Sequence, residues 1–274
     1  MSYKRVLSIQ DISCFGQCSL TVALPLISAC GVECSILPSA VLSTHTAGFS
    51  GYTVRDLSGD FADIFAHWNK SGIKYDAIYT GYLGSTEEVA SVMELMDAFP
   101  SLRIVDPAMA DNGVLYPAFD MAYVSEMKKL CSTADIVIPN ITEACMLTDM
   151  PYKTEYDESY IRELIDRLSG LGAKTVILTG VSYKAARTGV AVFENGTYSY
   201  YEHKKIDRSC HGTGDVYASA FVGALFNGND AYTSAKIAAD FTVRCIENTI
   251  GDEKHWYGVK FETMIPELIA AVRK

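Results

Sequence analysis

The stretch Cys210-His211-Gly212-Thr213-Gly214-Asp215, followed by the apolar run from Val216 to Phe226, decides the fold. It has the pattern of a glycine-rich turn that leads into a buried helix. The glycines on either side of Thr213 let the backbone approach a ligand closely. The free amides and the dipole of a helix start favour an anion. The sequence therefore predicts a phosphate site at this turn.

Asp215 stands in the first turn of the predicted helix, beside the anion site. A carboxylate repels a phosphate unless it holds a proton or a metal ion. Its presence therefore indicates a base that deprotonates a hydroxyl during phosphoryl transfer. The motif alone also permits a structural role, in which Thr213 caps the helix and Asp215 complements its dipole. Residues elsewhere in the chain bear on this choice.

The composition of the chain narrows its class and its partners. Hydrophobic residues make up 49% of the 274 residues and charged residues 20%, which suits one α/β domain over residues 1–274. The net charge of −10 argues against nucleic acid or an anionic membrane as a partner. No apolar stretch reaches the roughly 20 residues of a membrane span, and the N-terminus lacks a signal-peptide pattern. We therefore expect a cytoplasmic protein.

Four of the eight cysteines form two closely spaced pairs, Cys14 with Cys18 and Cys30 with Cys34. Zinc sites use similar spacings in loops. Here, however, the segment between Cys18 and Cys30 predicts a helix, and Cys34 opens an apolar strand. Reduced and mostly buried thiols are the favoured interpretation.

Strand and helix patterns alternate from residue 6 to residue 180. The predicted strands cover residues 6–9, 34–37, 76–80, 103–105, 135–138 and 174–178. The predicted helices cover residues 20–29, 56–70, 86–99, 122–131 and 157–171, with another opening at 141. A hairpin over 188–201 turns at Asn195-Gly196, and helices follow over 230–247 and 261–272. This order predicts an α/β fold with a doubly wound, mostly parallel central sheet and helices on both faces.

Polar residues stand just past the predicted strand ends or in the linking turns: Asp11, Thr46, Tyr82, Asp106, Glu143, Thr179 and Asp215. The carboxyl ends of parallel strands share one edge of a sheet, so these side chains can converge on one site. Taken singly, Asp106 could be a turn residue. Asn140 and Glu143 could form a capping box, or could hold water around Mg²⁺, and the cap is locally favoured.

Four stretches together resemble the ribokinase superfamily and, within it, the pyridoxal kinases. Gly212-Thr213-Gly214-Asp215 is similar to the superfamily's anion hole and base, and Asn140-Ile141-Thr142-Glu143 to its Asn-x-x-Glu element. The runs from Tyr79 to Ser85 and from Asp106 to Asp111 are similar to two pyridoxal kinase motifs. The likeness extends from about residue 5 to about residue 250. It implies a ribokinase-like fold, and the short span 12–34 leaves no room for the separate lid domain of sugar kinases.

The resemblance implies ATP-dependent phosphorylation of the 5′-hydroxymethyl group of pyridoxal, pyridoxine or pyridoxamine. It implies that Asp215 is the base and that the backbone amides of Gly212, Thr213 and Gly214 form the anion hole. A homodimer is also implied, and a monovalent cation is left open as a further requirement.

For the nucleotide, the resemblance implies Mg²⁺ near Glu143 and Asp106, held partly through water. Asn140 would act on the metal and the phosphates together with Glu143. Thr179 would contact the phosphates as well.

For the acceptor, the resemblance implies contacts from Thr46, in its substrate loop, and from Tyr82. Asp11 stands where pyridoxal kinases usually have a serine that contacts the pyridine ring. An acid there could accept a hydrogen bond from the 3-hydroxyl, pair with a protonated ring nitrogen, or favour an amine-bearing substrate. Ser13 is an alternative source of the missing hydroxyl.

Cys210 and His211 directly precede the anion hole and are further substrate-binding candidates. The Cys210 thiol could add reversibly to the aldehyde of pyridoxal. A packed thiol is the favoured alternative.

Two other functions stay open. A hydroxymethylpyrimidine kinase of thiamin synthesis shares the fold and the chemistry, but that group tends to carry Cys where this chain has Asp215. A degenerate kinase that only binds a vitamer or nucleotide would have no use for a base beside a phosphate.

Overall fold

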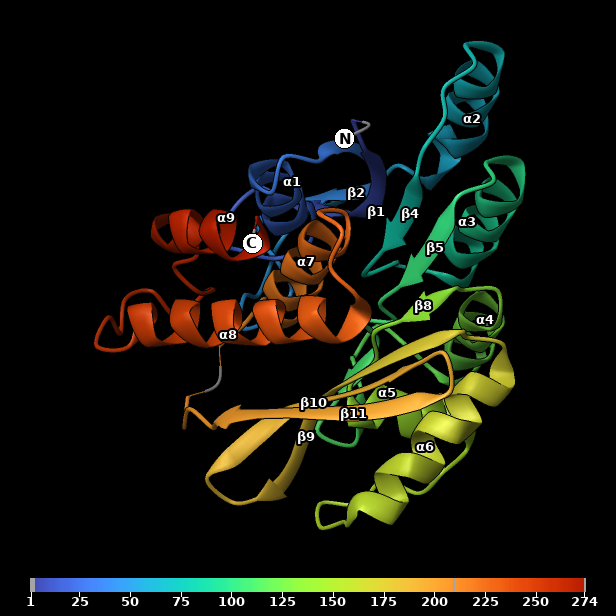
Figure 1. The fold of residues 1–274 in the computed structure, drawn as a ribbon. Helices are drawn as coiled ribbons and strands as arrows, with labels where there is room; N and C mark the ends of the chain where they lie inside the picture. Colours follow the sequence, from blue (N-terminus) through green and yellow to red (C-terminus); the bar gives the residue numbers. More distant parts are fainter. Residues whose placement is uncertain (1–2, 209, 274) are drawn as a thin grey trace.

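The computed structural model describes residues 3–208 and 210–273. A nine-stranded sheet runs through it in the order β11-β10-β9-β8-β5-β4-β1-β2-β3 (Figure 1). The strands are β1 (Arg5–Ser13), β2 (Glu33–Leu42), β3 (Val54–Asp56), β4 (Ala77–Thr80), β5 (Leu102–Val105), β8 (Ile136–Val137), β9 (Thr175–Lys184), β10 (Arg187–Glu194) and β11 (Thr197–Lys204). In the sheet, the neighbouring strands β9, β8, β5, β4, β1 and β2 are all parallel to one another. Strands β3, β10 and β11 are antiparallel to their neighbours. The predicted α/β fold is confirmed.

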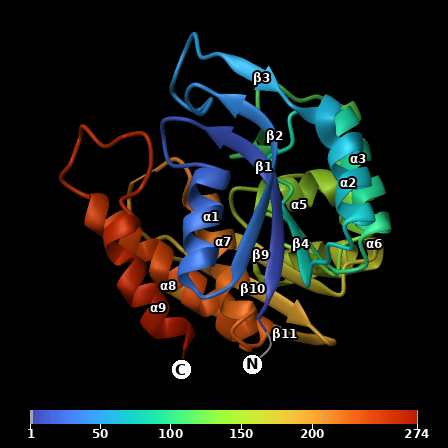
Figure 2. The ribbon, with the colours of Figure 1, turned by 90° about the horizontal axis from the view of Figure 1, so that it is seen from above.

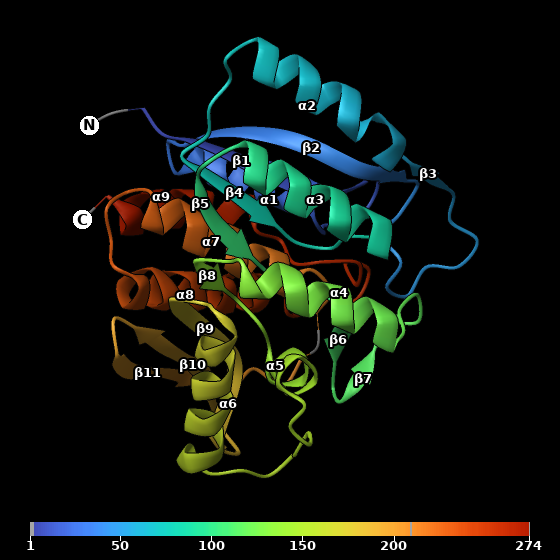
Figure 3. The same cartoon turned by 90° about the vertical axis from the view of Figure 1, so that its right-hand side faces the viewer.

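Helices cover both faces of the sheet. One face carries α1 (Leu20–Ala29), α7 (Thr213–Leu225), α8 (Ala231–Thr249) and α9 (Ile265–Val272). The other face carries α2 (Phe61–Lys70), α3 (Thr86–Ala98), α4 (Met121–Ser132), α5 (Ile141–Thr148) and α6 (Glu158–Leu171), and Figure 3 looks onto it. Short 3-10 turns, η1 (Ser58–Asp60) and η2 (Glu262–Met264), precede α2 and α9. Within the described residues, none of the helices is both long and apolar enough to cross a membrane.

Strand β1 shows how the sheet is buried on both sides. Leu7 and Ile9 belong to the core under α2–α6, whereas Val6 belongs to the core under α1 and α7. All three side chains are fully buried. Side chains of a strand alternate between its two faces, so an apolar run without alternation marks a strand that is covered on both.

The strand order changes direction at β1. The chain first places β2 on one side of β1 and then places β4 and the later parallel strands on the other side (Figure 2). In open parallel sheets, ligands bind in the crevice at such a switch point, beyond the carboxyl ends of the strands. The ends of β1 and β4 therefore mark the expected place of the site.

The first strand is longer than predicted. It continues to Ser13, so Asp11 and Ser13 lie within the strand and not beyond its end. The pairing with β2 resumes after an irregularity, because Gln10 pairs with Pro38 and Ile12 pairs with Val41. A bulge of this kind redirects side chains and is frequent beside active sites.

The second strand also runs further than predicted, to Leu42, although it contains Pro38. Strand β3 pairs only with the residues from Ala40 to Leu42, so Pro38 lies where β2 has no strand on its outer side, and beside the register shift against β1, two settings that tolerate proline. The helix predicted from residue 56 begins at Phe61 instead, since residues 54–56 form β3.

The prediction that a strand ends at residue 178 is wrong, and Thr179 lies inside β9. The strand continues because it pairs with β10 in a hairpin. A second hairpin was not predicted. It consists of β6 (Ala110–Asp111) and β7 (Val114–Leu115) and turns at Asn112-Gly113, with φ of 51° and 81°. The Asn-Gly pair was the sequence signal for this turn.

Candidate active site

The phosphate end of the site is the start of α7. Gly212 is the N-cap residue, and the first helical hydrogen bond runs from the amide of Val216 to the carbonyl of Gly212, at 3.0 Å. Among the described residues, no side chain caps this end, and the amides of the first turn, from Thr213 to Asp215, have no helical acceptor. Thr213 is not the N-cap: its hydroxyl donates to the carbonyl of Cys210 at 3.3 Å. The helix start is thus open to an anion.

The two glycines of this turn serve different purposes. Gly212 has φ of 73°, and a Cβ there would lie 1.9 Å from the carbonyl oxygen of Gln17. Only glycine fits this position, where the turn packs against the loop after β1. A Cβ at Gly214 would meet no atom within 4 Å. The space in front of Gly214 is free for a ligand.

Asp215 is a half-buried residue at this anion site. Burial raises the pKa of its carboxyl group to about 7, a hydrogen bond from the Ser19 backbone opposes this shift, and the charge of Asp11 adds to it. A group with a pKa near neutral pH is well suited to accept a proton from a hydroxyl.

Asp11 and Ser13 lie on the acceptor side of Asp215. The Asp11 side chain is 4% exposed, and the Ser13 hydroxyl donates to it at 3.1 Å. Burial raises the pKa of Asp11, whereas hydrogen bonds from the Ser19 and Ser13 side chains lower it. Ser19 thus stabilises both carboxylates. No sequence pattern pointed to this residue, whose backbone is strained at φ 54° and ψ −130°.

Tyr82 and the loop of residues 43–50 complete this side. Burial, together with the charges of Asp11 and Glu88, raises the pKa of Tyr82 to about 12, so Tyr82 lies near Asp11. Thr46 is an exposed residue of the loop. The buried His45 anchors the loop, because its Nε2 donates to the carbonyl of Tyr257 at 2.8 Å.

Four aromatic residues form a wall beside this loop, and sequence reasoning missed it. We call Phe15, Phe49, Trp256 and Tyr257 the aromatic wall. The Phe49 and Trp256 ring centroids lie 4.6 Å apart, as do those of Phe15 and Tyr257. His211 joins it, since its ring lies 6.5 Å from that of Trp256. These contacts link distant parts of the chain, so no local pattern announces them.

Cys210 is a free thiol, and so are Cys14, Cys18, Cys30 and Cys34. Cys210 is half-buried and packs at the margin of the core under α7. Burial and the charges of Asp215 and Asp11 raise the pKa of Cys18 well above its usual value, so this thiol also lies beside the two carboxylates.

Glu143 and Asn140 form a complete capping box at the start of α5. The Glu143 amide donates to Asn140 Oδ1 at 3.0 Å, and the Asn140 amide donates to Glu143 Oε2 at 2.9 Å. The amides of Met109 and Ala110 donate to Glu143 Oε1 at 2.9 and 3.4 Å. The local preference for the cap is confirmed, and the same carboxylate also ties α5 to the segment after β5.

Asp106 follows β5 and lies beside this box. Its Oδ1 accepts a hydrogen bond from the amide of Ala108 at 3.2 Å. Burial and the charges of Glu143 and Asp215 raise the pKa of Asp106. Three carboxylates therefore act on one another here, which is a setting that a divalent cation would relieve.

Thr179 reaches the same place from β9. It forms a parallel bridge with Asn140, and its amide donates to the carbonyl of Pro139 at 2.9 Å. The structure thus gathers the predicted residues into two groups. We call Asp11, Ser13, Tyr82 and His211 the candidate acceptor end, and the start of α7 with Asp106, Asn140, Glu143 and Thr179 the candidate phosphate end; Asp215 lies between them.

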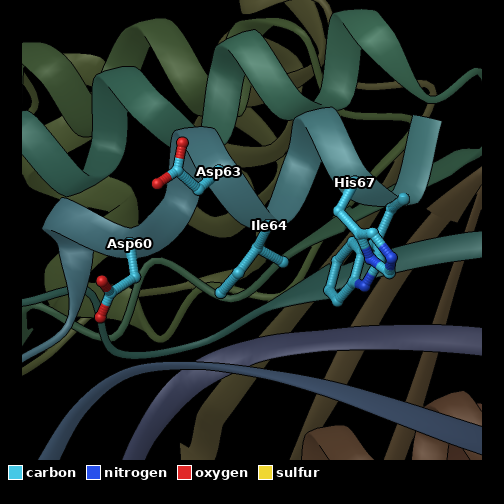
Figure 4. Close-up of a pocket in the computed structure, with 5 residues that line it drawn as sticks. Asp60, Asp63, Ile64 and His67 are labelled. Carbon is cyan, nitrogen blue, oxygen red and sulfur yellow. The ribbon is translucent and has the colours of Figure 1, made fainter. Parts of the chain in front are cut away.

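A separate pocket of about 440 Å³ lies along α2 and is lined by Asp60, Asp63, Ile64, His67 and Trp68 (Figure 4). Figure 4 shows Asp60, Ile64 and His67 on one side of the helix. None of its lining residues comes from a strand end at the switch point. It is therefore not part of the two groups above.

The parallel sheet, the open helix start and the acid beside it define a kinase of the ribokinase-like class. The phosphomethylpyrimidine kinase family model matches residues 24–259, and the chain belongs to this family, alongside the pyridoxal kinases.

Three relatives illustrate the likeness. A phosphomethylpyrimidine kinase candidate from Bacteroides thetaiotaomicron, solved with pyridoxal, is 34% identical with a TM-score of 0.92, covering 97% of this chain and 96% of its own. Pyridoxal kinase from Lactobacillus plantarum is 30% identical with a TM-score of 0.91, covering 98% of both chains. The pyridoxine/pyridoxal/pyridoxamine kinase of Bordetella bronchiseptica is 29% identical over 260 residues, 89% of each chain.

Proposed function

We propose that this protein is an ATP-dependent kinase that phosphorylates the 5′-hydroxymethyl group of a B6 vitamer. The observation that carries the proposal is Asp215, a carboxyl group whose pKa is raised to about 7 and which stands at an uncapped helix start. The names of the relatives support the acceptor, since two of the three are B6 vitamer kinases and the third was solved with pyridoxal.

In the proposed reaction, Asp215 takes the proton of the acceptor hydroxyl as the oxygen attacks the γ-phosphoryl group of ATP. The amides of Gly212, Thr213 and Gly214 stabilise the charge that grows on the transferred group. The free space in front of Gly214 and the absence of a side-chain cap at this helix start support this role.

The residues at the phosphate end fit Mg²⁺. Asp106 would hold the ion directly, because only one backbone amide among the described residues occupies its carboxylate. Glu143 would act mainly through water, since three backbone amides already engage its two oxygens. When bound, Mg²⁺ neutralises charge on the phosphate oxygens. Asn140 and Thr179 would lie beside the phosphates, and a monovalent cation stays an open requirement.

At the acceptor end, the proposal places the ring of the vitamer between the strand β1 and the loop of residues 43–50. The side chains proposed to bind it are Asp11, Ser13, Thr46, Tyr82, Cys210 and His211. The buried position of Asp11 and its closeness to Asp215 support a polar contact with the ring.

A second candidate is hydroxymethylpyrimidine kinase, because the family model that matches this chain is described as phosphomethylpyrimidine kinase. It would use the same base and anion site on another flat heterocycle with a hydroxymethyl arm. The two proposals differ only in the acceptor.

The test is ADP release from Mg-ATP with pyridoxal, pyridoxine, pyridoxamine and hydroxymethylpyrimidine, each supplied alone. We expect turnover on at least one B6 vitamer that exceeds turnover on hydroxymethylpyrimidine. Turnover on hydroxymethylpyrimidine alone would assign the second function. Saturable vitamer binding without ADP release would show a binding protein and contradict both kinases.

A further inference from the structure

Asp11 is placed in an unusual way for a charged side chain. It is 4% exposed and lies at the irregularity where the register of β1 against β2 shifts. The Ser13 hydroxyl is its hydrogen-bond donor at 3.1 Å. A buried carboxylate is costly unless a positive charge or several donors compensate it. The Ser13 and Ser19 hydroxyls compensate it in part, and neither of them carries a positive charge.

The surroundings of Asp11 are negative. Across residues 3–208 and 210–273, no ion pair includes Asp11. Its charge raises the pKa of Asp215 and, with Glu88, that of Tyr82. His45 is the one basic side chain whose charge contributes to the pKa of Asp11 among the described residues. The acceptor end therefore has an excess of negative charge.

The neighbouring imidazole has an unused polar atom. His45 is 4% exposed, and its Nε2 donates to the carbonyl of Tyr257, since a carbonyl can only accept. Its Nδ1 is buried and has no hydrogen-bond partner among the residues that the structure describes, and the same holds for the Thr44 hydroxyl. Buried polar atoms are normally paired. The unpaired Nδ1 belongs to the imidazole whose charge acts on Asp11, so a polar ligand beside Asp11 would offer it a partner.

We propose that Asp11 binds a protonated nitrogen of the acceptor, so that cationic heteroaromatic alcohols are the preferred substrates. A cation offsets the charge of Asp11 and also that of the nearby Asp215, which a neutral hydroxyl cannot do. The inference deepens the proposed function and rests on it. The cationic nitrogen can belong to the ring or to an aminomethyl arm, and the experiment separates these two sources.

The experiment compares Asp11→Asn, which keeps the shape and removes the charge, with the wild-type protein. The probes are pyridoxamine, pyridoxine, and a pyridoxine analogue with C–H in place of the ring nitrogen. We expect kcat/KM to fall about tenfold or more for acceptors that carry the nitrogen Asp11 binds. A loss on pyridoxine and pyridoxamine that spares the analogue identifies the ring nitrogen. A loss on pyridoxamine alone identifies the arm.

The analogue also controls for an indirect effect. Removing the charge of Asp11 changes the proton affinity of Asp215, and this change acts equally on all three acceptors. An equal loss on all three, or a change of less than threefold on every one, overturns the inference. Calorimetric binding of ADP and the melting temperature show whether the variant is folded. Failure of the wild-type protein on both vitamers contradicts the proposed function itself, and the inference with it.

Discussion

The two ends of the site are built in different ways. The candidate phosphate end gathers groups at the starts of helices, namely the open amides of α7 and the capping box of Asn140 and Glu143. The candidate acceptor end gathers side chains from strand β1, such as Asp11, and from loops that are distant in sequence, as in the contact of the Phe49 and Trp256 rings at 4.6 Å. We expect the first kind of site to serve the phosphoryl donor and the second to select the acceptor.

The largest expected effect belongs to the residue that lies between these ends. Replacing Asp215 with Asn should lower kcat about 10³-fold, because the amide cannot accept the proton of the hydroxyl. The affinity for ADP should change little, since the helix amides proposed to bind phosphate remain. Steady-state ADP release and calorimetric titration measure the two quantities. Equal losses in turnover and in ADP affinity would show that Asp215 only shapes the phosphate end.

The glycines of the turn offer a matched pair of variants. Gly212→Ala places a Cβ 1.9 Å from the Gln17 carbonyl oxygen at a positive φ, and should destabilise the fold by about 2 kcal/mol or more. Gly214→Ala meets no atom within 4 Å and should leave the melting temperature nearly unchanged.

Activity separates the same pair further. Gly214→Ala should still lower kcat, because its methyl group enters the space assigned to the phosphoryl group. Thermal unfolding followed by the ADP assay gives both readouts. Normal stability together with normal turnover in the Gly214→Ala enzyme would contradict the assignment of the phosphoryl group to this helix start.

The pH dependence of kcat should report Asp215. Burial raises its pKa to about 7, so the carboxyl group is increasingly protonated, and inactive as a base, as the pH falls through this value. We expect kcat to decrease about tenfold per pH unit below 7 and to level off above it. The profile is measured at saturating vitamer and Mg-ATP. A flat profile between pH 5 and pH 8 is the contradicting result.

The smallest expected effect lies in the aromatic wall. Trp256→Ala removes the ring that packs on Phe49 at 4.6 Å and should raise the KM of the vitamer roughly threefold to tenfold. The KM of ATP should stay constant, because the wall belongs to the acceptor end. Trp256→Phe serves as the control and should restore most of the vitamer affinity. A parallel rise in both KM values would instead indicate a general disturbance of the structure.

The sequence predicted most of the phosphate end because its signals are local. Helix α7 begins at Thr213, inside the glycine-rich turn quoted from the sequence, and the capping box spans four residues with a fixed pattern. The role of Asp215 as base remains a prediction. Helix α7 could be predicted because a glycine-rich turn is followed directly by a run of small apolar residues.

The acceptor end could not be predicted to the same degree. The irregular register at Asp11 depends on how β1 pairs with β2, and the strained Ser19 depends on packing against the start of α7. The aromatic wall needs Trp256 to meet Phe49 across most of the chain. Such contacts follow from the tertiary fold and leave no periodic pattern.

One measurement tests the central claim most directly. The protein is incubated with Mg-ATP and an equimolar mixture of pyridoxal, pyridoxine, pyridoxamine and hydroxymethylpyrimidine, and the phosphorylated products are identified by mass spectrometry. The account predicts that B6 vitamer 5′-phosphates dominate and that the Asp215→Asn protein forms almost none. A product mixture dominated by hydroxymethylpyrimidine phosphate, or equal products from both proteins, would contradict it.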